Sequence, residues 1–243
     1  MIDLTEQLSS KLNGLTREFE IIAHNMANAS TTGFKRKCNT FSQSLAAQGT
    51  ETQAETDTKT ELHSVFDFSQ GNFIETGRSL DFALCGNGFF VIETPDGPLY
   101  TRNGMFRLDQ NGQIADSSGR IVSGQAGPIS IPPNVGLSQI HVSSDGSISA
   151  AGTTVGKFKL VDFKDKEGEL VAAGLNCFQA SETAEPQTPE SIIIKQGFQE
   201  NSNVQMVEEL VDMIMVTRLY EANMKFMSVG KDVSESLLRV AMG

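Results

Sequence analysis

The segment LSSKLNGLTREFEIIAHNMANA, residues 8–29, carries the periodicity that decides the fold of the first part of the chain. Its apolar side chains recur at alternating spacings of four and three residues. This heptad pattern is typical of a helix that packs along one apolar seam against another helix. We expect a helix over residues 4–28, with a seam formed by Leu8, Leu12, Leu15, Phe19, Ile22 and Met26.

The end of this helix is marked by residues that suit a turn. Asn28 can cap the preceding turn, and Gly33 allows the chain to leave the helix where a Cβ atom would clash. We therefore expect Asn28 and Gly33 to act as turn or hinge residues.

Residues 206–243 form a second and longer apolar pattern. Ser202 and Gln205 fit a capping box in front of it. Apolar residues cover most of the circumference of this predicted helix, so we expect it to be buried on several sides. Its candidate interface residues are Met206, Val207, Leu210, Val211, Met213, Ile214, Tyr220, Met224 and Met227.

The size of this apolar surface implies partners. Burying the N-terminal seam alone is worth on the order of 10–20 kcal/mol, at about 1.5–3 kcal/mol per side chain. The C-terminal helix would be about 57 Å long, too long for a small domain to cover. We expect the two terminal helices to pair with each other and also with helices of other subunits.

The middle of the chain has the composition of strands and turns. All seven prolines lie within residues 95–189, and 17 of the 22 glycines lie within residues 71–197. Apolar runs at 89–92 and 99–101 flank a Pro-Asp-Gly turn, and runs at 140–142 and 147–149 flank Asp145-Gly146. These are hairpin signals. Gly86 and Gly88 predict a tight bend or bulge before the first of these strands.

The sequence thus predicts a mixed, mainly β fold. An antiparallel β domain, barrel-like or sandwich-like, spans residues 65–200. Residues 1–37 and 201–243 form a discontinuous helical domain that pairs as a coiled coil. Residues 38–64 form a polar linker, which contains a Thr-rich run at 49–60.

Charge and composition exclude several functions. The net charge of −11 argues against nucleic-acid binding, which needs a basic face. The sequence has no apolar run of the roughly 20 residues that a membrane helix needs. Three cysteines give no disulfide framework and no metal-ligand spacing. Charged residues within the first fifteen positions argue against a cleaved signal peptide.

No motif in the chain calls for catalysis. The Gly86-Asn-Gly88 sequence precedes a predicted strand, whereas a phosphate-binding loop must open a helix. Asp109-Gln-Asn-Gly112 fits a β-turn better than a calcium loop. We expect no catalytic, cofactor-binding or metal-binding residues, and no small-molecule substrate.

Four strings carry a resemblance to a known family. They are Ala23-His-Asn-Met-Ala-Asn-Ala-Ser-Thr-Thr-Gly-Phe-Lys35, the segment SLDFALCGNGFFV at 79–91, the segment YTRNGMF at 100–106, and the segment SNVQMVEELVDMI at 202–214 with RLYEAN at 218–223. In this order, they resemble the signatures of the bacterial flagellar rod and hook family.

The resemblance implies a non-enzymatic axial subunit of the flagellar basal-body rod, proximal or distal. It implies that the terminal helices form the inner tube of a helical polymer, with the β domain outside, and that the rod transmits torque for motility. Its partners would be further copies and other rod or hook axial proteins. Export would use the flagellar type III apparatus, and the rod would span the periplasm.

Other functions remain open from the sequence. One is a hook-type axial protein of the same family, although a hook protein is expected to carry additional outer domains. Another is a cell-surface or cell-wall protein with a coiled-coil stalk. A third is an enzyme that acts on cell-wall polymer, which would need carboxylates clustered in a cleft.

Overall fold

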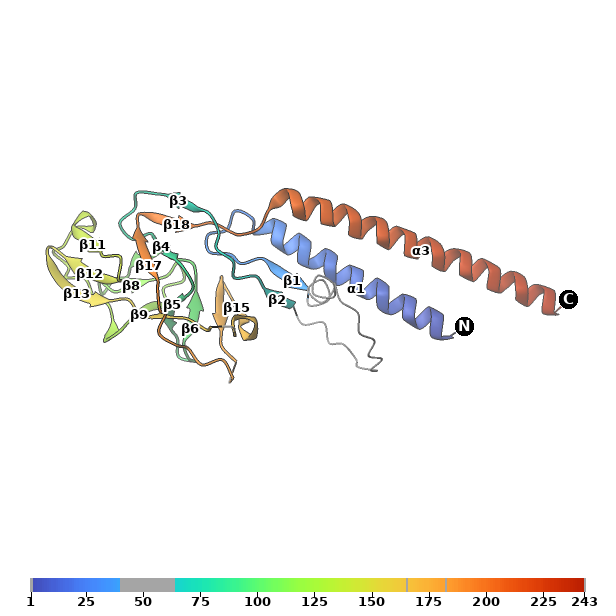
Figure 1. Cartoon of the computed structure of the whole chain (residues 1–243), viewed down its shortest axis with the longest axis horizontal. Coiled ribbons are helices and arrows are strands. Elements are labelled where there is room, and N and C mark those ends of the chain that lie inside the picture. Colours follow the sequence, from blue (N-terminus) through green and yellow to red (C-terminus); the bar gives the residue numbers. More distant parts are fainter. Residues whose placement is uncertain (1, 40–63, 165, 182, 243) are drawn as a thin grey trace. The chain divides into compact units, whose positions relative to one another are not determined.

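Figure 1 shows the computed structural model of the chain, which describes residues 2–39, 64–164, 166–181 and 183–242. The chain divides into two compact units. The helical unit comprises Met1–Ala27, Lys37–Ser64 and Gln205–Gly243, and the β unit comprises Asn28–Arg36 and Val65–Val204. The predicted linker is described only at its two ends, and its Thr-rich run 49–60 lies outside the described residues.

The division differs from the predicted domains at residues 28–36 and 201–204, which both belong to the β unit. Residues 28–36 follow the first helix in sequence but belong to the β unit. Phe34 and Lys35 are buried there, and the backbone N–H of Gly33 donates a hydrogen bond to the C=O of Glu200 at 2.7 Å. The partners in these contacts are far away in sequence, and helical periodicity gives no information about such contacts.

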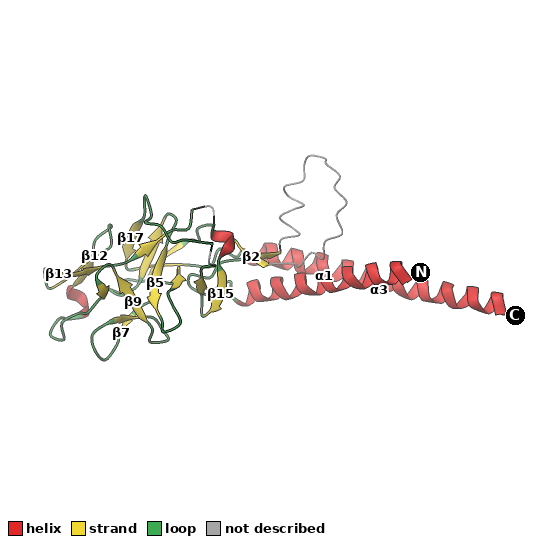
Figure 2. Cartoon of the chain, turned by 90° about the horizontal axis from the view of Figure 1, so that it is seen from below, coloured by secondary structure: helices red, strands yellow, loops and turns green. Residues whose placement is uncertain are grey.

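The helical unit consists of α1 (Ile2–Ala27), the short strand β1 (Lys37–Asn39) and α3 (Met206–Met242). The helices run side by side in opposite directions, so both chain termini lie at the same end of the pair (Figures 1 and 2). At 1.5 Å per residue, α1 is about 39 Å long and α3 about 56 Å. The predicted pairing of the terminal helices is confirmed, and α3 extends well beyond the length that α1 can cover.

The start of α3 is built differently from the predicted capping box. The helix begins at Met206. The hydroxyl of Ser202 accepts a hydrogen bond from the N–H of Val204 at 3.2 Å, so it caps a turn ahead of the helix. The hydroxyl of Ser202 thus bonds two residues ahead, to Val204, which lies before the first residue of the helix.

The β unit is built from short antiparallel strands. The main sheet, with nine strands among the described residues, has the order β15-β16-β6-β5-β9-β8-β7, with β10 and β14 pairing at its side. Its strands are β5 (Phe89–Glu93), β6 (Leu99–Thr101), β7 (Arg107–Leu108), β8 (Ile114–Ala115), β9 (Ile121–Gly124), β10 (Gly127–Pro128), β14 (Leu160–Val161), β15 (Val171–Gly174) and β16 (Cys177–Gln179).

Smaller sheets complete the unit. One is the three-stranded sheet β11-β12-β13, and two are the pairs β17-β4 and β18-β3. The strand β2 (Ser64–Phe66) and two short 3-10 helices, η1 (Leu137–Gln139) and η2 (Glu167–Glu169), lie between these strands in sequence. The remaining bounds are β3 (Phe73–Glu75), β4 (Phe82–Cys85), β11 (Ile140–Val142), β12 (Ser147–Ala150), β13 (Thr153–Lys157), β17 (Ile193–Gln196) and β18 (Phe198–Glu200).

The predicted hairpins are present. β5 pairs with β6 around the Pro-Asp-Gly turn, and β11 pairs with β12 around Asp145-Gly146. The Asp109 turn is also a structural turn, as predicted. Its carboxylate accepts hydrogen bonds from the N–H groups of Asn111 and Gln113 at 2.8 and 2.7 Å. The carboxylate therefore stabilises the connection between β7 and β8.

Strand β5 explains why its sequence is continuously apolar instead of alternating. Phe90 packs into one hydrophobic cluster, and Phe89 and Val91 pack into a second. A strand that is buried on both faces needs apolar residues at every position. Each cluster is built around aromatic rings in edge-to-face contact, such as Phe90 with Phe106 at 5.1 Å between centroids and Phe68 with Phe89 at 5.3 Å.

We predict that Phe90→Ala lowers the free energy of unfolding by about 3–5 kcal/mol, because it leaves a cavity in the first cluster that close-packed neighbours cannot refill. Chemical denaturation of the full chain, followed by near-ultraviolet circular dichroism, measures this. The control is Val171→Ala on the edge strand β15, where the side chain is exposed and the change should stay within about 0.5 kcal/mol. Equal losses for the two variants would contradict the assignment of the core.

Candidate assembly interface and a buried ion cluster

The predicted seam of α1 is partly covered in the single chain. Ile22 is buried, and Phe19 is 44% exposed. The other predicted seam residues, Leu8, Leu12, Leu15 and Met26, are half-buried. The buried side of the helix near its end also includes Asn25, which the apolar pattern did not single out. Part of the seam therefore stays available for contacts outside the chain.

Most of the predicted interface residues of α3 are exposed in the single chain. Within this helix, the side chains of Glu209 and Val216 are buried. Met213 and Met227 are half-buried. The exposed candidates are Met206, Val207, Leu210, Val211, Ile214, Tyr220 and Met224, with exposed fractions from 39% for Tyr220 to 73% for Val207.

Further large apolar side chains of α3 are exposed as well. They are Met215, Leu219, Phe226, Val229 and Val233. Together with the exposed candidates above, we call these residues the open face of α3. Covering exposed apolar side chains in this number would lower the free energy, so we expect the open face to favour contact with another protein surface.

A polar contact crosses the helical unit at Asn25. The side chains of Asn25 and Glu209 are both 0% exposed. The amide nitrogen of Asn25 lies 3.4 and 3.3 Å from the two carboxylate oxygens of Glu209 and donates to them. The same amide group pairs with the backbone of Lys37, donating to its C=O at 2.9 Å and accepting from its N–H at 2.8 Å.

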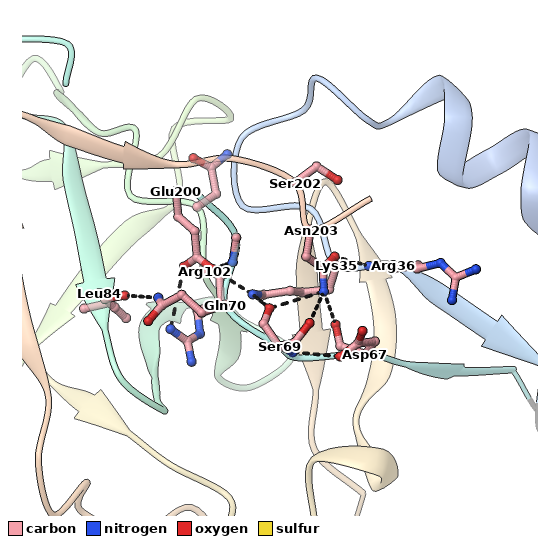
Figure 3. A network of polar contacts seen from close by, with 12 residues as sticks. Lys35, Arg36, Asp67, Ser69, Gln70, Leu84, Arg102, Glu200, Ser202 and Asn203 are labelled. Carbon is pink, nitrogen blue, oxygen red and sulfur yellow. Dashed lines mark hydrogen bonds and ion pairs between the residues drawn. The ribbon is translucent and has the colours of Figure 1, made fainter. Parts of the chain in front are cut away.

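The β unit contains a cluster of fully buried ions, shown in Figure 3. The carboxylate of Glu200 accepts a hydrogen bond from the ammonium group of Lys35 at 2.8 Å. It also accepts from the N–H of Gly71 at 2.9 Å and lies 3.6 Å from the guanidinium group of Arg102. Two cations thus share one carboxylate that is sealed from water.

Burial dominates the electrostatics of this cluster. Loss of hydration lowers the pKa of Lys35 below its ordinary value, and the nearby charge of Glu200 opposes this effect. The same desolvation lowers the pKa of Arg102, again opposed by Glu200. The carboxylate is therefore the group that makes it possible to keep both cations inside the unit.

The cluster joins three segments of the β unit. Each of them lies close in sequence to a point where the chain passes from one unit to the other. Lys35 also donates to the C=O of Ser69 at 2.6 Å. The side chain of Asn203 accepts from the N–H of Arg36 at 2.7 Å and donates to the C=O of Asp67 at 2.8 Å. Residues 33–36, 67–71 and 200–203 are thereby held against one another.

Two of the predicted turn residues, Asn28 and Gly33, lie before and within the first of these segments. Asn28 accepts a backbone hydrogen bond from Thr31 at 3.0 Å. Gly33 has a φ of 69°, and a Cβ atom there would lie 2.5 Å from the backbone nitrogen of Asn103. Gly86 and Gly88 also have positive φ values, 101° and 139°, before β5. At Gly33 both the conformation and the available space exclude a side chain.

Sequence reasoning gave no role to five residues that the structure places in these contacts: Asn25, Lys35, Arg102, Glu200 and Glu209. Asn25, Lys35, Arg102 and Glu209 lie inside the strings that carry the family resemblance, and Glu200 lies two residues before one of them. Arg102 and Glu200 have polar neighbours in sequence, so the pattern gave no signal that they are buried.

The described part of the chain contains neither a candidate metal site nor a membrane-spanning helix. No group of three or more His, Cys, Asp or Glu side chains is placed there to hold a metal ion. None of the described helices is long and apolar enough to cross a bilayer.

Comparison with known proteins agrees with the architecture. Residues 83–150 match the family described as Flagellar hook protein FlgE/F/G D1 domain, and residues 195–240 match Flagellar basal body rod FlgEFG protein C-terminal. The chain is 35% identical to the flagellar basal-body rod protein FlgG of Buchnera aphidicola from Acyrthosiphon pisum, over 89% of this chain and 91% of the relative. The chain belongs to the flagellar basal-body rod protein family.

Further relatives include both kinds of rod protein. The chain is 34% identical to FlgF of Mesorhizobium japonicum, over 85% of this chain and 84% of the relative. It is 30% identical to FlgG of Bacillus subtilis, over 95% and 96%. As a flagellar rod protein, the chain is a structural, non-enzymatic axial subunit of the basal-body rod, and this family assembles with rod and hook axial proteins.

In this rod protein, we predict that Glu200→Gln lowers the free energy of unfolding by about 3–5 kcal/mol, because two buried cations lose the charge that compensates them. Lys35→Met should cost less, since Glu200 and Arg102 then remain as one anion and one cation. Urea denaturation of the full chain measures both. Glu190→Gln, at an exposed ion pair with Lys164, is the control and should leave the midpoint unchanged. A midpoint for Glu200→Gln equal to that of the wild type would rule out this role.

Proposed function

We propose that this chain polymerises through its two terminal helices into the rod, which acts as a drive shaft and transmits torque. Its neighbours in the polymer are further copies of the chain and other rod or hook axial proteins. We also propose that it reaches the rod by flagellar type III export and that the rod spans the periplasm. These proposals rest on membership of the rod protein family.

The observation that carries the proposal is the open face of α3. Val207 is 73% exposed, and Ile214 is 56% exposed. The helix α1 is about 17 Å shorter than α3, so it cannot cover this surface alone. Fully burying one such side chain is worth about 1.5–3 kcal/mol, and the face contains many of them. Helices of neighbouring subunits are the surfaces that would cover it.

To transmit torque, the β unit and the segments that connect it to the helices must move together without deforming. The ion cluster supports this requirement. Lys35, Glu200 and Asn203 hold the segments that lead into and out of the β unit, and all three make hydrogen bonds within it. Buried ion pairs resist displacement because separating them leaves an uncompensated charge out of water.

We predict that the double variant Val211→Gln, Ile214→Gln prevents rod assembly while the chain keeps its helical content. The two side chains are already half-exposed, so their further burial on assembly is worth about 2 kcal/mol per subunit, roughly a thirtyfold change in the concentration needed to assemble. The measurements are swimming in soft agar and the yield of purified basal bodies. The control is Val211→Ile, Ile214→Val, which keeps both side chains apolar at the same positions. Normal rods from the Val211 and Ile214 variant would contradict assembly through this face.

We predict that mass spectrometry of purified basal bodies, with hooks and filaments removed, finds this chain in stoichiometric amount, because an axial subunit is retained in the rod. Wild-type cells that are flagellated and express the protein are the required material. Absence of the chain from their basal bodies would leave the family membership intact and contradict its place in the rod of that organism.

A further inference from the structure

Asn25 of α1 and Glu209 of α3 form a buried polar contact between the two helices. Both residues are fully buried, and among the side chains that the structure describes in these two helices, Ile22 and Val216 are the other buried ones. The carboxylate accepts from the amide nitrogen of Asn25 at 3.3 and 3.4 Å. A polar pair placed in an apolar seam lowers stability relative to well-packed apolar residues, and such pairs are known to determine register.

The amide of Asn25 has no freedom to choose another partner. Its oxygen accepts from the N–H of Lys37, and one of its two hydrogens is donated to the C=O of Lys37, at 2.8 and 2.9 Å. These two bonds fix the plane of the amide group. The remaining N–H therefore points to one position along the axis of α3, and Glu209 lies at that position.

Apolar contacts along the seam favour one register over another much less than the polar contact does. The apolar residues of both helices recur at heptad spacing, so a shift of α3 by seven residues, about 10.5 Å, again places apolar side chains against apolar side chains. Such a shift would bring Val216 to the level of Asn25. The free N–H of Asn25 would then be buried without an acceptor, which costs about 1–3 kcal/mol.

We propose that the hydrogen bond between Asn25 and Glu209 determines the register of α1 against α3. Asn25 is a positioning residue. Its hydrogen bond to Glu209 sets the axial position of α3 against α1, and its hydrogen bonds to Lys37 fix that position relative to the start of β1. This register is a property of one chain. The proposal therefore goes beyond polymerisation and can fail or hold independently of it.

The test is a heptad exchange. The variant Glu209→Val, Val216→Glu has the composition and net charge of the wild type but moves the carboxylate by seven residues. Spin labels at Arg17 and Arg218, both exposed, report the axial offset of the two helices by pulsed electron paramagnetic resonance. The labels are attached to cysteines introduced into a full chain whose Cys38, Cys85 and Cys177 are replaced by alanine.

We expect one narrow distance for the wild type, and a second distance for the exchange variant that corresponds to an axial shift of about 10.5 Å. Glu209→Gln, which keeps an acceptor for Asn25, should retain the wild-type distance. The double variant Asn25→Leu, Glu209→Leu should keep its helical circular dichroism but lose the single distance.

Three results would overturn the proposal. An unchanged distance in the exchange variant would mean that the chain connections at residues 28 and 205 already set the register. A broad distribution in the exchange variant, with no preferred distance, would mean that the polar pair is unable to select a register. A variant that only lost stability would show a lower denaturation midpoint with the wild-type distance, and this also counts against the proposal.

Discussion

The rest of the β unit depends on the buried carboxylate of Glu200. An unpaired carboxylate in such a place would cost several kcal/mol, so its partners must all be in position when the unit folds. Those partners come from three distant parts of the chain: Lys35, Gly71 and Arg102. The same carboxylate thus requires that the segment after α1 and the segment before α3 be packed into one unit with the strands between them (Figure 3).

The two units bury their apolar side chains to different extents. The β unit encloses its aromatic side chains in two clusters, and β5 contributes to both. The helical unit buries a few residues between α1 and α3 and leaves a long apolar face exposed. A subunit of an axial polymer needs this combination, since a closed unit keeps its shape while an open helix face gains free energy only when neighbours cover it.

Buried polar contacts supply the specificity that the apolar surfaces lack. Leucine, valine and methionine side chains pack acceptably against many partners, whereas a buried amide or carboxylate is satisfied in one arrangement. In the helical unit this role belongs to Asn25 and Glu209, and in the β unit it belongs to Lys35, Arg102 and Glu200. All five lie within or close to the strings that carried the family resemblance, and their contacts offer a physical reason for these polar residues in the motifs.

The sequence by itself determined the two terminal helices, the hairpins around Pro95–Gly97 and Asp145–Gly146, and the resemblance to rod proteins. These features are local: heptad spacing, turn residues and short apolar runs act between residues close in the chain. Only the tertiary structure decided that residues 28–36 belong to the β unit, that Phe19 is exposed while Asn25 is buried, and which charges are sealed from water. Whether a polar side chain is buried depends on partners supplied from elsewhere in the chain, and periodicity carries no information about them.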